Sequence, residues 1–284
     1  MKKIYKFLIV FLISILLQNI LFFSFAVNEE ITTYSPSCLL MEISTGKILY
    51  EKNTNEKMYP ASTTKLMTAI LAVEKCQLTD IATVKSSAVS NIPEGYTSAY
   101  LREGEQFSIE QLLRVLLIPS ANDAANVIAE HIGGSISSFA EMMNQKAKEL
   151  GCKNTNFTNP SGIHDENHYS TSYDLAIIGQ YALKNKTIAD ICNSTYCELP
   201  STQIYNGNTR FFYTTNSLLV PYQSPDYYYE YATGLKTGYT DFAKDCIVAT
   251  ATKDGITLLA VILGAKNTSS GYSERFLDCH TLFE

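Results

Sequence analysis

The hydrophobic and polar positions divide the chain into strands near both ends and helices between them. Residues 38–43 and 48–50, separated by a turn, have the pattern of a β-hairpin. Apolar residues at helical spacing predict helices over 62–74, 111–117, 121–131, 138–150 and 173–183. The pattern then predicts strands over 234–239, 246–251 and 256–263 and a closing helix over 270–283. We therefore expect an α+β domain whose antiparallel sheet takes strands from both chain ends, with a mostly helical middle.

The first 26 residues have a different pattern. Lys2, Lys3 and Lys6 precede an almost unbroken apolar run, which ends at Ser24-Phe25-Ala26. This order predicts a cleaved signal peptide over 1–26. An uncleaved anchor is the alternative, because the run nearly reaches the length that spans a bilayer. In both cases we expect one exported domain over 27–284, on the outer face of the cytoplasmic membrane or in the cell wall. Membrane attachment is expected only if the segment stays uncleaved.

Composition and charge narrow the class of protein. The 284 residues are 46% hydrophobic and 18% charged, which suits a folded domain with a sizeable core and excludes a disordered chain. With 22 basic and 28 acidic residues, the formal net charge is −6. Nucleic-acid binding needs a concentrated basic surface, so we expect no nucleic-acid partner.

Seven cysteines are scattered along the chain with no CxxC pair. An odd number leaves at least one thiol unpaired in a monomer, which exported proteins of oxidising compartments usually avoid. We interpret the count as the sign of a host, such as an anaerobe, whose exported proteins are not routinely oxidised. We expect these residues to be small buried hydrophobic side chains rather than nucleophiles paired with His164 or His168.

The segment Pro60-Ala-Ser-Thr-Thr-Lys65 stands at the start of the first long predicted helix. Ser62 and Lys65 are three residues apart, so on a helix they share one face. A desolvated lysine with a lowered pKa can take the proton of a serine hydroxyl and make it nucleophilic. The alternative is that Ser62 only caps the helix and Lys65 is a solvated charge.

Two further motifs follow in the chain. Ser120-Ala121-Asn122 stands where one predicted helix breaks and another begins, so its hydroxyl and carboxamide can face one cleft. Lys236-Thr237-Gly238 lies within a predicted strand, where a glycine lets a ligand approach the backbone. The ordered set SxxK, SxN and KTG is typical of penicillin-binding proteins and, with SDN in the middle, of class A β-lactamases.

With these motifs the chain resembles the D-alanyl-D-alanine carboxypeptidases, the low-molecular-mass penicillin-binding proteins, from about residue 33 to the end. Residues 117–125, 159–170 and 234–241 look like the family's SxN segment, the loop after it and the third motif. The resemblance implies a β-lactamase/transpeptidase-like fold. Lys244 departs from the pattern, because the family usually has glycine after the alanine that stands here at 243. We also expect the family's C-terminal β-rich domain and its membrane-binding helix to be absent.

The resemblance further implies a serine peptidase reaction without a cofactor. Ser62 would attack the penultimate D-alanine carbonyl of a peptidoglycan pentapeptide stem, with Lys65 as the base. Ser120 would pass the proton to the leaving D-alanine, and water would hydrolyse the acyl-enzyme. β-Lactams would act as covalent inhibitors of Ser62.

The resemblance assigns the remaining site residues to substrate binding. Asn122 would bind the substrate amide, and Lys236 with Thr237 the terminal carboxylate. Gly238 would let the strand approach the substrate. The backbone N–H groups of Tyr239 and Ser62 would form the oxyanion hole. If Lys236 does not bind the carboxylate, Arg210 or Arg275 is the next candidate.

Three alternatives remain open from the sequence. A class A-like β-lactamase has SDN and a deacylating E-x-x-L-N segment, whereas residues 120–122 and 166–170 differ from these patterns. A non-catalytic penicillin sensor or wall-binding domain would keep Ser62 and Lys65 but stay acylated. A metal enzyme would use His164 and His168, but the residues around them are not HExxH and no third ligand is indicated.

Overall fold

The computed structural model describes residues 31–90, 92–222, 225–269 and 271–284, so the signal-peptide prediction over 1–26 lies outside the described residues. Thr33–Glu284 form one unit by their contacts. Within the described ranges, no helix combines the length and the apolar character that crossing a bilayer requires.

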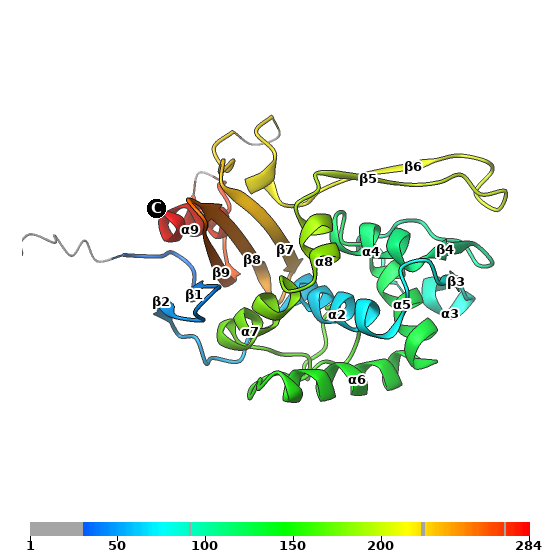
Figure 1. Ribbon diagram of the computed structural model, residues 1–284, viewed down its shortest axis with the longest axis horizontal. Coiled ribbons are helices and arrows are strands. Elements are labelled where there is room, and N and C mark those ends of the chain that lie inside the picture. Colours follow the sequence, from blue (N-terminus) through cyan, green and yellow to red (C-terminus); the bar gives the residue numbers. More distant parts are fainter. Residues whose placement is uncertain (1–30, 91, 223–224, 270) are drawn as a thin grey trace, which may run out of the picture. The chain divides into compact units, whose positions relative to one another are not determined.

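A five-stranded antiparallel sheet takes strands from both ends of the described chain, as the sequence predicts (Figure 1). Its order is β2-β1-β9-β8-β7. The strands are β1 (Ser37–Glu42), β2 (Ile48–Lys52), β7 (Ala232–Thr240), β8 (Lys244–Lys253) and β9 (Ile256–Ala265). Pairing of β1 with β9 joins the N-terminal hairpin to the C-terminal strands.

Both faces of this sheet are buried. Alternate residues of β1 enter different apolar clusters, with Leu39 and Met41 in one and Cys38 and Leu40 in the other. Helix α9 (Glu274–Phe283) covers the second face, and α7 (Ser172–Ala182) packs on β1 and β9 from the first. Since α9 begins at Glu274, the predicted closing helix over 270–283 is shorter than expected.

The middle of the chain is mostly helical, as predicted. Its α-helices are α2 (Lys65–Lys75), α3 (Ser86–Ser90), α4 (Ile109–Leu117), α5 (Asn122–Gly133), α6 (Ile136–Glu149) and α8 (Lys186–Cys192). Two short 3₁₀ turns, η1 (Ala61–Thr64) and η2 (Ser217–Leu219), add to them. The predicted helix over 62–74 is therefore divided, and Ser62 lies on η1 rather than on an α-helix.

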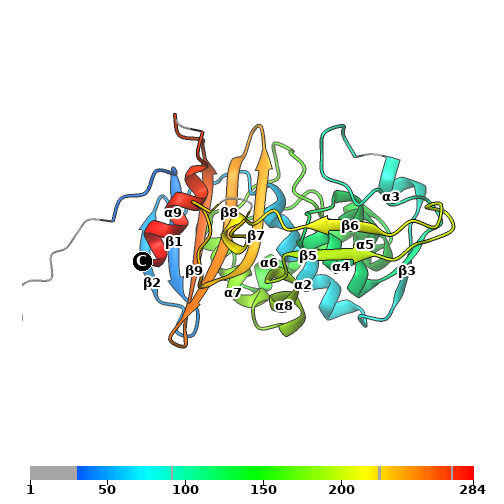
Figure 2. The same cartoon turned by 90° about the horizontal axis from the view of Figure 1, so that it is seen from above.

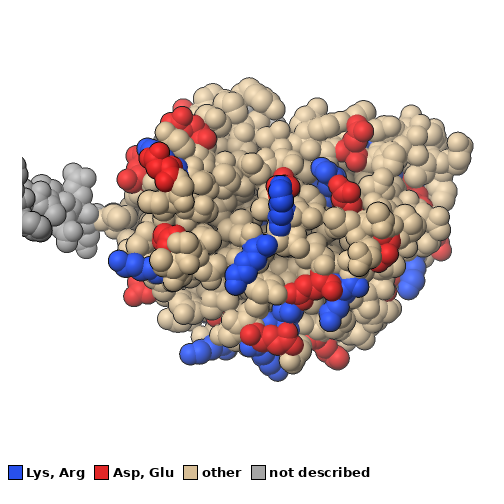
Figure 3. Space-filling model, in the orientation of Figure 1, with Lys and Arg blue, Asp and Glu red and all other residues tan. Residues whose placement is uncertain are grey.

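Two short ribbons were not predicted from the sequence. One pairs β3 (Ile81–Thr83) with β4 (Gln106–Ser108), and the other pairs β5 (Tyr196–Leu199) with β6 (Arg210–Tyr213). The second ribbon runs alongside α4 (Figure 2). On the face that Figure 3 shows, acidic and basic side chains are interspersed rather than gathered by sign.

All seven cysteines are free thiols in the structure. Burial raises the pKa of Cys38, Cys152, Cys192, Cys197 and Cys246 to about 12. Such thiols carry almost no thiolate at neutral pH, so their environment suits packing and not nucleophilic catalysis.

Candidate active site

A cleft of about 380 Å³ brings residues of all three motifs together. Its lining includes Ser62, Ser120, Asn122, Thr237, Gly238 and Tyr239. The segment 94–97 also lines it, and Thr215, Thr240, Asp241 and Arg275 complete the lining. The two motif lysines, Lys65 and Lys236, lie buried next to the cleft rather than in its lining.

Lys65 connects the first two motifs. Its Nζ lies 2.8 Å from Ser62 Oγ and donates to Asn122 Oδ1 at 2.8 Å and to the Ser161 carbonyl at 2.7 Å. The side chain has no exposed surface. Burial, and next the charge of Lys236, hold the pKa of Lys65 well below its ordinary value. The structure therefore places a weakly basic amine against the Ser62 hydroxyl.

The capping alternative for Ser62 and Lys65 is wrong in this structure. The starts of η1 and α2 have no side-chain cap, and the Ser62 hydroxyl instead contacts the Lys65 amine. Lys65 is fully buried rather than solvated.

The backbone around Ser62 is strained and tightly packed. Ala61 and Ser120 have φ angles of 47° and 74°, which side-chain-bearing residues rarely adopt. Such residues gather at functional sites, where the surrounding structure holds them in place. A Cβ added to Gly162 would lie 1.8 Å from the Ala61 carbonyl, so the loop after the SxN motif supports η1 by direct backbone contact.

Gly238 brings β7 against the same turn. A Cβ at this position would lie 2.8 Å from Ser62 N and 3.0 Å from Ala61 Cβ. The glycine is thus required by the contact of the strand with the turn η1 that carries Ser62. The Tyr239 side chain is 57% exposed and donates its hydroxyl to Asp241, so the predicted contribution of Tyr239 through its backbone is compatible with the structure.

Asn122 begins α5 with both ends of its carboxamide oriented. Oδ1 accepts from Lys65, and Nδ2 donates to the Thr97 carbonyl at 2.9 Å. A carboxamide nitrogen carries two hydrogens, so the second remains for a ligand in the cleft. Ser120, two residues earlier, is 6% exposed at the cleft surface.

Two cations lie at the third motif: Lys236 within it and Arg275, which belongs to none of the three motifs. Lys236 is 1% exposed and donates to the Thr237 carbonyl at 3.0 Å, and burial lowers its pKa to about 7. Arg275, from α9, is the one cation among the described residues that line the cleft. Its Nη1 donates to the Gly238 carbonyl at 3.0 Å and lies 2.9 Å from Asp245 Oδ1. The Thr237 hydroxyl shares a hydrogen bond of 2.5 Å with Thr215.

The metal alternative gains no support from the histidines. His168 Nδ1 accepts from the Thr158 N–H at 3.1 Å, and Nε2 contacts the Thr64 hydroxyl at 2.8 Å. Both nitrogens therefore have protein partners, and burial lowers the pKa of His168 to about 4. His164 stacks on Phe242 with ring centroids 3.8 Å apart. In the part of the chain that the structure describes, no group of three or more candidate ligands is suited to a metal.

Known proteins share this sequence pattern. The profile of the peptidase S11 family, described as D-alanyl-D-alanine carboxypeptidase, matches residues 24–267. The D-alanyl-D-alanine carboxypeptidases DacF of Bacillus subtilis and DacC of Escherichia coli are 37% and 33% identical, each over 89% of this chain. The chain spans 66% and 64% of these relatives, slightly less than two thirds of their length.

Solved structures share the fold. The Streptomyces K15 DD-transpeptidase matches with a TM-score of 0.79 and 29% identity, over 89% of this chain and 96% of that chain. A D-alanyl-D-alanine carboxypeptidase from Mycobacterium tuberculosis H37Rv matches with a TM-score of 0.81 and 27% identity, over 91% and 93% of the two chains. The predicted β-lactamase/transpeptidase-like fold is confirmed. With the three motifs gathered in one cleft and a family match over most of its length, the chain belongs to the D-alanyl-D-alanine carboxypeptidase family.

Proposed function

We propose that this protein is a serine-type D-Ala-D-Ala carboxypeptidase that removes the terminal D-alanine from peptidoglycan stem peptides. The observation that carries the proposal is the 2.8 Å contact between Ser62 Oγ and the buried amine of Lys65. The names of the relatives agree with this activity. Glu166, the first residue of the segment compared with the deacylating motif of a class A β-lactamase, is exposed and is not among the residues that line the cleft.

The reaction begins with proton transfer from Ser62 to the neutral Lys65 amine. Ser62 Oγ bonds to the carbonyl carbon of the penultimate D-alanine, while the backbone N–H groups of Ser62 and Tyr239 stabilise the oxyanion. Removal of one such donor typically costs about 3–4 kcal/mol of transition-state stabilisation. The C–N bond then breaks, and Ser120 passes a proton to the departing D-alanine. Water hydrolyses the resulting ester and restores Ser62.

The substrate is held from both sides of the cleft. Asn122 donates its remaining N–H hydrogen to the substrate amide, and Gly238 keeps β7 close to the nucleophile. The terminal carboxylate is met by the Thr237 hydroxyl and the Arg275 guanidinium, with Lys236 adding positive charge from behind the strand. A buried anion needs such charged and hydroxyl partners, because without them its removal from water costs several kcal/mol or more of free energy.

The substrate lies outside the cytoplasm, which agrees with the signal peptide that we propose over 1–26, or with an uncleaved anchor there. Residues 27–284 would then be the exported peptidase domain. Peptidoglycan stems are its proposed partners and β-lactams its covalent inhibitors. No metal or other cofactor enters the proposed reaction.

The test combines a penicillin with a D-Ala-D-Ala peptide. Intact-mass spectrometry should find one penicillin adduct, peptide mapping should place it on Ser62, and Ser62→Ala should abolish it. The enzyme should also release D-alanine from the peptide, unaffected by EDTA. A lasting adduct without release of D-alanine would indicate a sensor, and rapid penicillin turnover a β-lactamase. Absence of any adduct on folded protein would overturn the proposal.

A further inference from the structure

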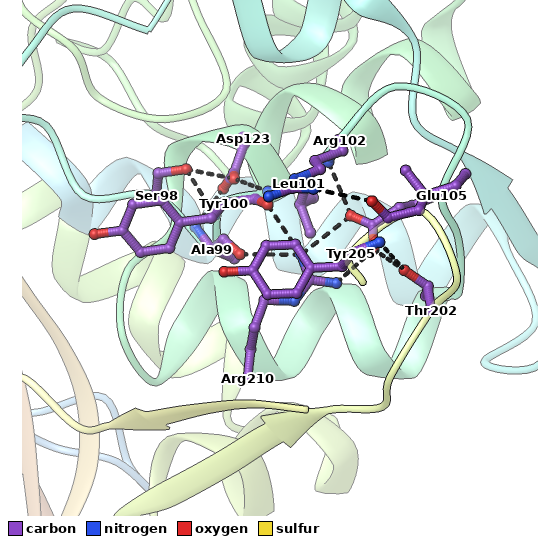
Figure 4. Close-up of polar contacts among 11 residues, drawn as sticks. Ser98, Ala99, Tyr100, Leu101, Arg102, Glu105, Asp123, Thr202, Tyr205 and Arg210 are labelled. Carbon is purple, nitrogen blue, oxygen red and sulfur yellow. Dashed lines mark hydrogen bonds and ion pairs between the residues drawn. The ribbon is translucent and has the colours of Figure 1, made fainter. Parts of the chain in front are cut away.

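Residues 94–97 of the cleft lining continue into residues 98–101, the clamped segment, which lies between a buried carboxylate and a buried guanidinium (Figure 4). On one side, the N–H groups of Ala99 and Leu101 donate to Asp123 at 2.9 and 3.0 Å. The Ser98 hydroxyl donates to the same carboxylate at 2.6 Å. Asp123 is 1% exposed and directly follows Asn122 on α5. The donors of the clamped segment are thus tied to the helix that carries the SxN asparagine.

On the other side, the carbonyl groups of the clamped segment accept from Arg210, at the start of β6. Arg210 Nη1 donates to the Tyr100 carbonyl at 3.0 Å and to the Ala99 carbonyl at 3.4 Å. Tyr100 has a φ of 56°, a conformation that needs support from its surroundings. The guanidinium supplies that support from a ribbon distant in the sequence.

Arg210 is itself held by Glu105. The two side chains are 4% and 0% exposed and form two hydrogen bonds, of 2.7 and 3.1 Å. Glu105 also accepts from the Arg102 N–H at 2.8 Å and from the Thr202 hydroxyl. The centroid of the Tyr205 ring lies 4.1 Å from the Arg210 guanidinium carbon. Arg210 is therefore not available as the alternative carboxylate-binding cation.

The clamped segment begins directly after Thr97, whose carbonyl orients Asn122. This carbonyl accepts from both the backbone N–H and Nδ2 of Asn122, each at 2.9 Å. The second bond decides which end of the carboxamide faces Lys65, because a turned carboxamide would present N–H hydrogens to the Lys65 amine instead of Oδ1. The position of the Thr97 carbonyl thus affects both the base and the substrate contact.

We propose that Arg210 and Glu105 are positioning residues for Asn122, acting through the clamped segment and the Thr97 carbonyl. Neither residue lines the cleft. Their bonds to the segment's carbonyl side oppose the bonds of Asp123 to its N–H side, so the segment is fixed in two directions. The inference rests on the proposed acylation of Ser62 but not on which substrate the enzyme hydrolyses.

The test is a double-mutant cycle on the rate of Ser62 acylation by a penicillin. Arg210→Lys keeps the charge and loses the two-pronged geometry, and it should slow acylation at least about fivefold, since one misplaced contact near a reacting group strongly affects the rate. In the Asn122→Ala background the same change should slow acylation less than about twofold. The matched control is Arg114→Lys, which alters the exposed Arg114–Glu110 pair on α4 and should leave the rate unchanged.

A purely structural role predicts a different outcome. Equal loss of rate in both backgrounds, or no loss in either, would overturn the inference. If Arg210→Lys does not fold, the double variant Glu105→Leu/Arg210→Met removes both charges together and is used in its place, since loss of a whole buried pair is often tolerated. If the wild type is acylated but releases no D-alanine, the proposed function fails, while the acylation rates of the double-mutant cycle still test the inference. If the wild type is not acylated, hydrogen exchange tests the inference instead. The Asn122 N–H should exchange faster in Arg210→Lys than in Arg114→Lys, and equal exchange in the two variants would overturn the inference.

Discussion

At the scale of single residues, two buried lysines give the site its electrostatic character. Lys65 and Lys236 have almost no exposed surface, and burial is the main cause of both lowered pKa values. The charge of Lys236 further lowers the pKa of Lys65. Lys236 thus helps to keep Lys65 neutral, which is the form that the proposed reaction needs as a base. Acylation should therefore slow as the pH falls through the pKa of Lys65.

Lys236→Met should separate activity from stability. We expect kcat/KM for a D-Ala-D-Ala peptide to fall at least tenfold, about 1.4 kcal/mol. In the folded wild type the pKa of Lys236 is about 7, whereas in the unfolded chain it is near its ordinary value of 10.5. Between pH 7 and 10.5 the unfolded chain therefore binds more protons than the folded protein. Wild-type stability should therefore rise with pH across this window, and less so in the variant. Urea unfolding at several pH values measures the pH dependence of the free energy of unfolding. A variant that loses stability in proportion to its loss of kcat/KM would contradict the separation of activity from stability.

Amidation of the substrate's C-terminus tests which cation binds the carboxylate. It should lower wild-type kcat/KM at least about tenfold, because a charge-assisted contact is lost. The loss of kcat/KM on amidation should be smaller in Arg275→Gln, because this variant lacks the Arg275 side chain that lines the cleft. It should also be smaller in Lys236→Met. A full penalty in Lys236→Met would remove Lys236 from carboxylate recognition. A full penalty in Arg275→Gln would do the same for Arg275.

Lys244 takes the backbone conformation of glycine in the turn where the family usually has that residue. Its φ is 59°, in the left-handed region that glycine adopts without strain. Lys244→Gly should raise the free energy of unfolding by up to about 1 kcal/mol, as strain relief exceeds the added freedom of the unfolded chain. Lys244→Ala keeps the Cβ and removes the charge, so it should give no such gain in thermal unfolding. A gain in both variants would assign the effect to the charge.

The site residues within the motifs could be predicted from the sequence because each motif places its members by local geometry. Ser62 and Lys65 are one turn apart, and Lys236, Thr237 and Gly238 follow one another on a strand. Arg275 and Thr215 belong to no motif and reach the cleft only through packing of α9 and of the chain after β6. Without the tertiary structure, no local pattern distinguishes them from surface residues.

At the scale of elements, the prediction succeeded where apolar faces are wide and failed where strands are short. The strands of the main sheet and helices α2 and α4–α7 bury continuous apolar faces that produce clear periodicity. Strands β5 and β6 have four residues each, and Tyr196, Phe211 and Tyr213 are exposed large aromatics. Cys197 and Leu199 are buried, but the exposed aromatics place apolar residues on the other face as well, so the hydrophobic pattern gives no clear alternation.

The contact between β7 and η1 should be decisive for catalysis. Gly238→Ala places a methyl group against Ser62 N and Ala61 Cβ, so the strand and the turn must separate. We expect Ser62 acylation to slow about tenfold or more, because small displacements of a nucleophile have large kinetic effects. Gly255→Ala, in the turn between β8 and β9, is the control: its Cβ meets nothing within 4 Å, although its φ of 80° is unfavourable. It should lower thermal stability and leave the acylation rate intact, and equal acylation rates in the two variants would refute the role of Gly238.

At the scale of the whole molecule, the start of the folded unit is tied to the last helix. The Tyr34 and Ser35 N–H groups donate to Asp278 at 2.7 and 2.9 Å, and Asp278 on α9 has no exposed surface. The same helix carries Arg275 into the cleft. The ends of the described chain therefore close the sheet that supports the site, although neither end contributes a motif.

Asp278→Ala should reveal how much this closure contributes to stability apart from catalysis. In a protein that begins at Val27, the change leaves the buried Ser35 N–H and the part-buried Tyr34 N–H without their acceptor, which should lower the free energy of unfolding by about 1–3 kcal/mol. Asp278→Asn retains one acceptor oxygen and should lose roughly half as much, as measured by urea unfolding. Because Asp278 lies outside the cleft lining, the rate of Ser62 acylation per folded molecule should match the wild type in both variants. If acylation falls while the free energy of unfolding stays constant, α9 positions Arg275 through Asp278 and the two functions of the helix are not separable.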